Sequence, residues 1–176
     1  MDTSLATTYL GILLVLLAGA AFFVLRQVWR TRRVETTLSR LQKQANSPEA
    51  TPAVHYALGS LFLDKKMFGQ AIQEFQKALK DKDEMEPDHL SLVYNALGYG
   101  YVSQEQYDLA IRFYKDALKL VPDYSTAWNN LGFAYEKKQL VAPALEAYGE
   151  TLKLEPNNET AKRRTAALSK RVVTSA

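Results

Sequence analysis

The order of apolar and charged positions divides the chain into a short first part and a longer second part. No charged residue occurs between Thr3 and Leu25, and the 21 residues from Leu5 to Leu25 are almost entirely apolar. A helix of that length is about 30 Å long, which matches the hydrocarbon core of a bilayer. Beyond residue 52, apolar residues recur at the three- and four-residue spacing of amphipathic helices. The fold class predicted is therefore all-α, with a single N-terminal transmembrane helix before a helical array.

One frame of residues recurs three times in the array. Each copy is centred on a Leu-Gly dipeptide, with glycines at Gly59, Gly98 and Gly132. An aromatic residue follows each glycine at +3, an alanine at +12 and a second aromatic residue at +16. These residues are Phe62, Tyr101 and Tyr135; Ala71, Ala110 and Ala144; and Phe75, Tyr114 and Tyr148. Proline follows at +24 in the second and third copies, as Pro122 and Pro156. The slot four residues before the glycine holds His55, Tyr94 and Trp128.

This frame resembles the 34-residue tetratricopeptide repeat. The second and third glycines are 34 residues apart, and about five extra residues after the first repeat lie within Asp81–Pro87. The resemblance implies three pairs of antiparallel helices, with repeats at about 52–85, 91–124 and 125–158. The small glycine and alanine residues are expected to let the two helix backbones of a pair approach closely, and the prolines to end the second helix. Because one pair cannot bury its apolar face alone, the pairs are expected to stack into an α-solenoid.

The charges change the picture of the flanks. The net charge of +3 combines an excess of basic residues in 26–46 and in 159–176 with an acidic array in 47–158. Residues 26–51 are expected to form a basic juxtamembrane helix and linker, and residues 159–176 a basic C-terminal capping helix and tail. Since the array itself is acidic, no nucleic-acid partner is predicted.

Three interpretations of residues 1–25 stay open: an uncleaved anchor, a cleaved signal peptide and a buried helix of a soluble protein. A signal peptide begins with a basic region, whereas Asp2 is the charged residue here, and the apolar run continues beyond the small residues Ala18-Gly19-Ala20. We expect the anchor. The arginines after the span then place the array on the cytoplasmic or stromal side and the N-terminus outside or in the lumen. The residues expected at the membrane interface are Tyr9, Arg26, Trp29, Arg30, Arg32 and Arg33.

In tetratricopeptide proteins generally, the first helix of each repeat lines a concave groove that binds a peptide or a helix. The resemblance implies that the groove here contains Tyr56, Ser60, Asn95, Tyr99, Asn129, Phe133, Glu136 and Lys137, which we name the predicted groove. Asparagine amides both donate and accept, so they suit a peptide backbone, and the aromatic rings offer apolar area. The residues that match the basic groove of chaperone-tail binders are Tyr56, Asn95 and Asn129, which argues against such a ligand. The convex face, the cap and the membrane helix remain alternative contact sites.

The side chains with reactive chemistry predict a protein that is not an enzyme. The chain has no cysteine and two histidines, His55 and His89, neither of which belongs to a recognisable nucleophile–base pair. The glycines lie mainly in the span and in the Leu-Gly slots, so no phosphate-binding loop is present. We therefore expect no metal site, no cofactor and no small-molecule substrate.

An anchor, a basic helix, three repeats and a basic tail in one short chain resemble a known family. These are the membrane-anchored thylakoid tetratricopeptide proteins of cyanobacteria and plastids that assist photosystem I assembly. The resemblance implies a single-pass protein of the thylakoid or another inner membrane, in contact with lipid through its span. It implies photosystem I core subunits as the membrane protein partners. Two alternatives stay open: a scaffold for another bacterial envelope machine, and a receptor for targeting peptides.

Overall fold

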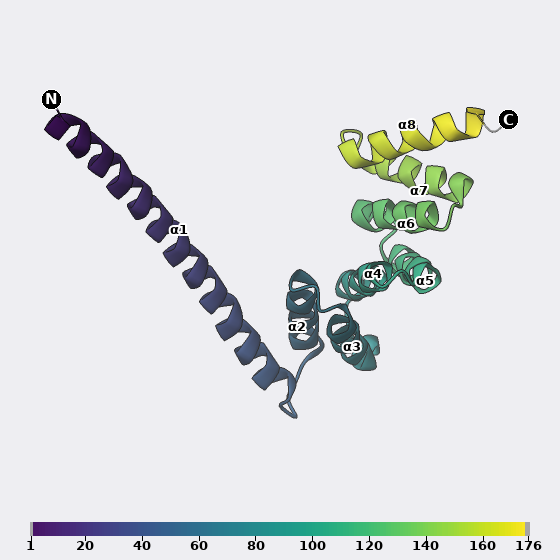
Figure 1. The fold of residues 1–176 in the computed structure, drawn as a ribbon. Helices are drawn as coiled ribbons and strands as arrows, with labels where there is room; N and C mark the ends of the chain where they lie inside the picture. The colour runs from purple at the N-terminus through teal and green to yellow at the C-terminus, as the bar shows by residue number, and fades with distance from the viewer. Residues whose placement is uncertain (1, 175–176) are drawn as a thin grey trace. The chain divides into compact units, whose positions relative to one another are not determined.

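The computed structural model describes residues 2–174, which divide into two units, Met1–Lys43 and Gln44–Ala176. The first unit consists of helix α1 up to Lys43, and the helix itself runs without interruption over Asp2–Ala45 (Figure 1). In the described part of the chain, α1 is the helix that is long and apolar enough to cross a membrane. Its apolar side chains from Tyr9 to Leu25 are exposed in the protein. The apolar run and the basic residues that follow it thus form one continuous helix, which ends at Ala45.

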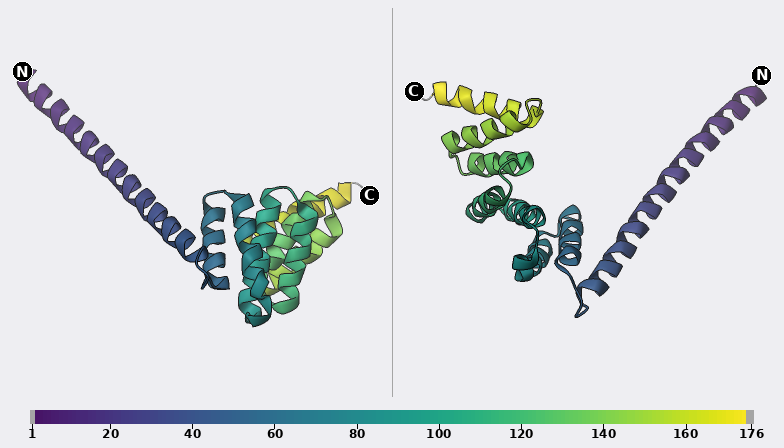
Figure 2. Two further views of the ribbon diagram at one scale, coloured as in Figure 1. Left: turned by 90° about the horizontal axis from the view of Figure 1, so that it is seen from below. Right: turned by 180° about the vertical axis from the view of Figure 1, so that it is seen from behind.

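The second unit is an array of helices joined by short turns (Figure 1). Its α-helices are α2 Pro52–Asp64, α3 Phe68–Ala78, α4 Pro87–Ser103, α5 Tyr107–Leu120, α6 Ser125–Lys137, α7 Val141–Leu154 and α8 Glu159–Thr174. Helices α2 and α3, α4 and α5, and α6 and α7 form three tightly packed pairs, each pair packs on the next, and α8 packs on α7. Figure 2 shows the same succession of pairs from two further sides. The expected fold, a three-repeat solenoid with a terminal helix, is confirmed.

The extra residues after repeat one begin earlier than the sequence suggested. They were expected within Asp81–Pro87, but helix α3 already ends at Ala78 and the 3-10 helix η1 follows over Leu79–Glu84. Asp81 leaves helical geometry, with φ −106° and ψ 34°. The regular α-helix therefore does not continue into the acidic residues that begin at Asp81.

The glycines in the Leu-Gly slots accommodate aromatic rings. A Cβ atom at Gly59, Gly98 or Gly132 would lie 2.6, 2.5 or 2.8 Å from the ring of the aromatic residue at +16. Those rings, Phe75, Tyr114 and Tyr148, are at most 1% exposed. The expectation that the glycine allows close contact with the opposite backbone was therefore incomplete, because the atoms nearest to the glycine belong to the ring.

The prolines and the last helix close the repeats as the sequence predicted. Helices α5 and α7 end two residues before Pro122 and Pro156, and the intervening residues Val121 and Glu155 are non-helical, with ψ 87° and 83°. Proline disfavours helical geometry in the residue before it, which explains both ends. Beyond them, α8 buries one side against repeat three, where Ala161 and Leu168 join Ala144 and Tyr148 in one apolar cluster.

Candidate protein-binding site

Asn95 connects repeats two and three inside the predicted groove. Its Nδ2 atom donates a hydrogen bond to the hydroxyl of Tyr124 over 3.2 Å, and its Oδ1 atom accepts one from Nδ2 of Asn130 over 3.1 Å. Tyr124 is the last residue before α6, and Asn130 lies within that helix. Both polar atoms of the Asn95 amide therefore have partners in the chain, and through them Asn95 links repeats two and three.

Tyrosines from several elements converge next to this amide. Burial raises the pKa of Tyr124, the nearby hydroxyl of Tyr56 raises it further, and the hydrogen bond with Asn95 lowers it. Burial also raises the pKa of Tyr114, and the nearby hydroxyls of Tyr99 and Tyr124 raise it further. The structure therefore brings the predicted Tyr56, Asn95 and Tyr99 into one neighbourhood. The Tyr99 side chain is 48% exposed and offers a free ring face to a partner.

Two predicted polar residues differ in how their atoms are satisfied. The Ser60 hydroxyl donates to the carbonyl of Tyr56 over 2.9 Å, within its own helix. In contrast, Oδ1 of Asn129 is buried and has no hydrogen-bond partner among the described residues. A buried acceptor without a partner is costly, so Asn129 is a polar position that the packing of the described residues leaves unsatisfied.

The predicted residues of α6 form a second group together with α8. The two carboxylate oxygens of Glu136 have separate partners: Oε2 accepts from the Tyr148 hydroxyl and Oε1 from Nη1 of Arg164, each over 3.0 Å. The ring of Phe133 has Nζ of Lys137 at 5.4 Å and Cζ of Arg164 at 5.6 Å from its centroid. Glu136 is therefore already neutralised, while Phe133 and Lys137 remain accessible in part.

Sequence reasoning assigned no groove role to Tyr124 and Arg164. Tyr124 lies in a turn, outside the repeat motif, so the motif contained no signal for it. Arg164 follows Asn130 by 34 residues, which is one repeat length. Extending the frame into the terminal helix would have placed Arg164 beside the groove residues of α6.

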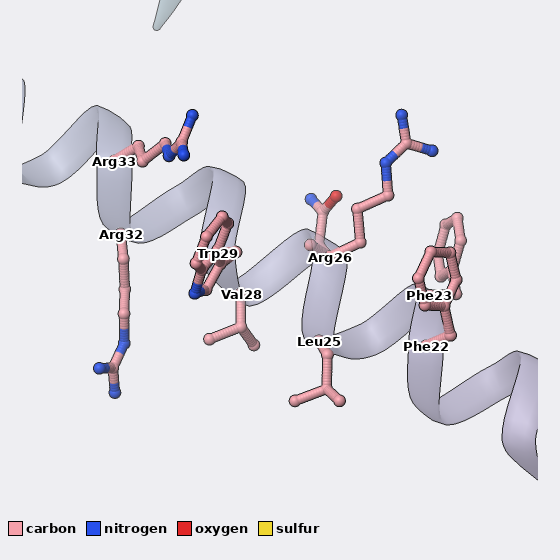
Figure 3. A pocket seen from close by; sticks show the side chains of 9 residues that line it. Phe22, Phe23, Leu25, Arg26, Val28, Trp29, Arg32 and Arg33 are labelled. Atoms are coloured by element: carbon pink, nitrogen blue, oxygen red, sulfur yellow. The ribbon is translucent and has the colours of Figure 1, made fainter.

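The residues expected at the membrane interface lie on α1. Tyr9 and Trp29 are 67% and 68% exposed, and the guanidinium carbon of Arg33 lies 4.8 Å from the Trp29 ring centroid. Figure 3 shows Trp29 and Arg33 on this helix, with Arg26 and Arg32 on different sides of it. The hollow that they line belongs to that single helix and is open to the surroundings. The side chain of Arg30 lies outside the described residues.

Comparison with known proteins agrees with this architecture. Models of the tetratricopeptide repeat match residues 52–80, 94–139 and 125–158. The fold and the repeat matches define a protein-interaction scaffold of the tetratricopeptide class. The ycf37 protein of Cyanophora paradoxa is 34% identical over 127 residues, which cover 72% of this chain and 73% of that protein. The chain belongs to the ycf37 family of plastid and cyanobacterial tetratricopeptide-repeat proteins.

A longer plant relative and two solved structures extend the comparison. The tetratricopeptide repeat domain-containing protein PYG7, chloroplastic, of Arabidopsis thaliana is 40% identical over 127 residues, which cover 72% of this chain but 42% of PYG7. MamA aligns with a TM-score of 0.72 and 20% identity over 80% of both chains. The first repeat domain of Spaghetti (RPAP3), bound to an HSP90 peptide, aligns with a TM-score of 0.65 and 20% identity, covering 70% of this chain and 94% of that domain. These two structures share the fold.

Proposed function

We propose that this protein is a membrane-anchored scaffold that holds subunits of a membrane protein complex during assembly. Residues 1–25 form the anchor, 26–51 the basic juxtamembrane segment, 52–158 the three repeats and 159–176 the cap and tail. The observation that carries the proposal is the exposed apolar helix α1 in the same chain as a protein-binding solenoid. An anchor keeps the array within reach of membrane clients and so raises their effective concentration.

The client that we propose is photosystem I, with the array on its stromal or cytoplasmic side. The membership of the ycf37 family and the chloroplastic relative support a photosynthetic membrane. The layout of anchor, basic helix and three repeats supports the same assignment, since it resembles the thylakoid assembly proteins. The predicted groove is the proposed contact, with the accessible rings of Tyr99 and Phe133 packing against a segment of the client.

Affinity capture from mildly solubilised thylakoids tests the client. The full chain is the bait, and residues 1–51, which lack the repeats, are the control. We expect photosystem I core subunits to be enriched by the full chain and not by the control. Equal recovery with both baits would reject photosystem I as the client of the array.

A pair of variants tests the groove. Tyr99→Ala combined with Phe133→Ala removes two accessible rings from the first helices of repeats two and three, and is expected to reduce capture about tenfold. The matched control is Leu109→Ala on α5, a second helix, where the leucine is 37% exposed. Circular dichroism should show unchanged helicity for both proteins. Full capture by the double variant would move the contact to another face of the array.

A further inference from the structure

The residue 15 positions after the repeat glycine differs in every repeat. It is Glu74 in repeat one, Phe113 in repeat two and Ala147 in repeat three. In repeat two the ring of Phe113 fills the space beside the first helix. It stacks on Tyr94 at a centroid distance of 6.1 Å and on Tyr101 at 5.4 Å, with an angle of 3° between the latter rings.

Repeat one fills the equivalent space with a polar contact. Oε2 of Glu74 lies 2.8 Å from Nδ1 of His55, which occupies the slot of Tyr94 in the frame. Both side chains are nearly buried, at 10% and 12% exposure. In repeats one and two, the side chain 15 residues after the repeat glycine therefore contacts the side chain four residues before that glycine.

In repeat three the alanine side chain is too short to make that contact. Trp128 and Tyr135 occupy the slots of Tyr94 and Tyr101, and beside them α5, α6 and α7 enclose a cleft. The lining used here consists of Lys115, Trp128, Tyr135, Pro143, Glu146 and Ala147, which we name the side cleft. The Trp128 ring is held in place because its Nε1 atom donates to the carbonyl of Pro122 over 2.8 Å. The cleft thus has two aromatic walls, one of them held by a hydrogen bond, and lacks the side chain that fills the equivalent space in repeat two.

The charges at the rim distinguish between possible occupants. The exposed Lys115 on α5 has its Nζ atom 5.7 Å from the Tyr135 ring centroid, whereas the neighbouring Lys119 is paired with Asp116 over 2.7 Å. In repeat two a cation, Arg112, lies 5.5 Å from the Phe113 ring. Repeat three carries Glu146 at the position of Arg112 in the frame. The cation available to a ring bound in the side cleft is therefore Lys115.

We propose that the side cleft binds an aromatic side chain from an acidic segment of a partner protein. The aromatic ring occupies the place that Phe113 occupies in repeat two, between Trp128 and Tyr135. A carboxylate next to it in the partner pairs with Lys115 at the rim. None of the residues of the side cleft belongs to the predicted groove, so this site is independent of the client proposed above.

Tryptophan fluorescence in the full chain tests this binding. Trp29→Phe leaves Trp128 as the reporter, since the chain has two tryptophans. The protein is kept in a nonionic detergent, and the probe is the peptide acetyl-Asp-Asp-Phe-Asp-Asp-amide. We expect a saturable change in Trp128 emission, with at least about tenfold weaker binding when alanine replaces the peptide's phenylalanine. The proposal is overturned if the emission shows no saturable change up to millimolar peptide. It is also overturned if the emission depends on the protein concentration alone, because a second copy of the chain then covers the cleft.

Two variants separate the side cleft from other surfaces. Ala147→Phe introduces the ring that repeat two carries at Phe113 and is expected to abolish the response to the peptide. Lys115→Glu leaves the packing intact and is expected to weaken binding of the acidic peptide at least fivefold. The matched control is Lys80→Glu, an exposed lysine that takes the place of Lys119 in repeat one. If both cleft variants bind the peptide as the parent does, the site is elsewhere and the proposal fails. Should Ala147→Phe misfold, unchanged binding by Lys115→Glu overturns the proposal alone.

Discussion

The glycines within the helices of the array are of two kinds. A Cβ atom at Gly98 would lie 2.5 Å from the ring of Tyr114, which is 1% exposed and has no room to move away. In contrast, a Cβ atom at Gly149 in α7 would meet no atom within 4 Å. The helix propensity of alanine favours the substitution equally at both positions. The difference in unfolding free energy between the two variants therefore measures the effect of the ring packing.

Gly98→Ala is expected to lower the free energy of unfolding by about 1–3 kcal/mol, because the ring must shift in a filled core. Gly149→Ala is expected to raise it by up to about 1 kcal/mol, because alanine is the better helix former. Urea unfolding followed by circular dichroism measures both. Equal changes in the unfolding free energy of the two variants would show that the packing of the Tyr114 ring does not require glycine at residue 98.

The Tyr114 hydroxyl gives this packing a dependence on pH. Burial raises the pKa of Tyr114 above its ordinary value of 10.0, so folding favours the neutral phenol. The stabilisation is fully present below about pH 10 and decreases as the pH rises beyond it, because the unfolded chain then ionises first. Tyr114→Phe keeps the ring and removes the ionisation. The loss of stability between pH 9 and pH 11 should be smaller in this variant, as measured by urea midpoints; an identical loss would contradict the argument.

The two helices of each repeat are connected by a turn, and the three turns have the same geometry. Lys66, Glu105 and Gln139 each have φ near +60°, and each lies seven residues after a Leu-Gly glycine. After α4, the N–H of Glu105 donates to Val102 and the N–H of Gln106 donates to Tyr101, both over 2.9 Å. This is the hydrogen-bond pattern of a Schellman motif, in which glycine usually occupies the left-handed position. The turn within each pair therefore carries backbone strain at a residue other than glycine.

Glu105→Gly is expected to raise the free energy of unfolding by about 0.5–1 kcal/mol. A non-glycine residue in the left-handed region costs roughly 1–2 kcal/mol, and the greater freedom of glycine in the unfolded chain offsets part of that gain. The comparison is Glu105→Ala, which keeps the strained conformation and should leave the stability nearly unchanged. Thermal unfolding of the two variants decides the matter, and a glycine variant no more stable than the alanine variant would refute the strain.

The sequence was sufficient where local pattern decides the structure, and insufficient where the stacking of repeats decides it. The Leu-Gly frame predicted the helix pairs, and the proline positions predicted the ends of α5 and α7. The early end of α3 was missed, since the insert has no counterpart in the other repeats. The contacts of Asn95 with Tyr124 and of Glu136 with Arg164 were also missed. Tyr124 lies in a turn and Arg164 in α8, and both meet their partners only after the pairs have stacked.

At the scale of the whole molecule, the proposed function depends on which side of the membrane the array occupies. The arginines that follow the apolar run, Arg26, Arg32 and Arg33, favour retention of that end on the cytoplasmic or stromal side. The acidic array then lies on the same side, where nascent and partly assembled subunits are accessible. The opposite orientation would separate the array from them even if the fold and the predicted groove were correct.

Labelling of single cysteines determines this orientation, because the chain has no native cysteine. Ser103→Cys places a thiol at the end of α4, and Ser4→Cys places one before the apolar run. In sealed thylakoids that expose their stromal face, a membrane-impermeant maleimide should label the variant at residue 103, and should label the variant at residue 4 only after detergent is added. The cysteine-free parent controls for background. The reversed pattern would place the array in the lumen, and labelling of both thiols in sealed membranes would show that α1 does not span the bilayer.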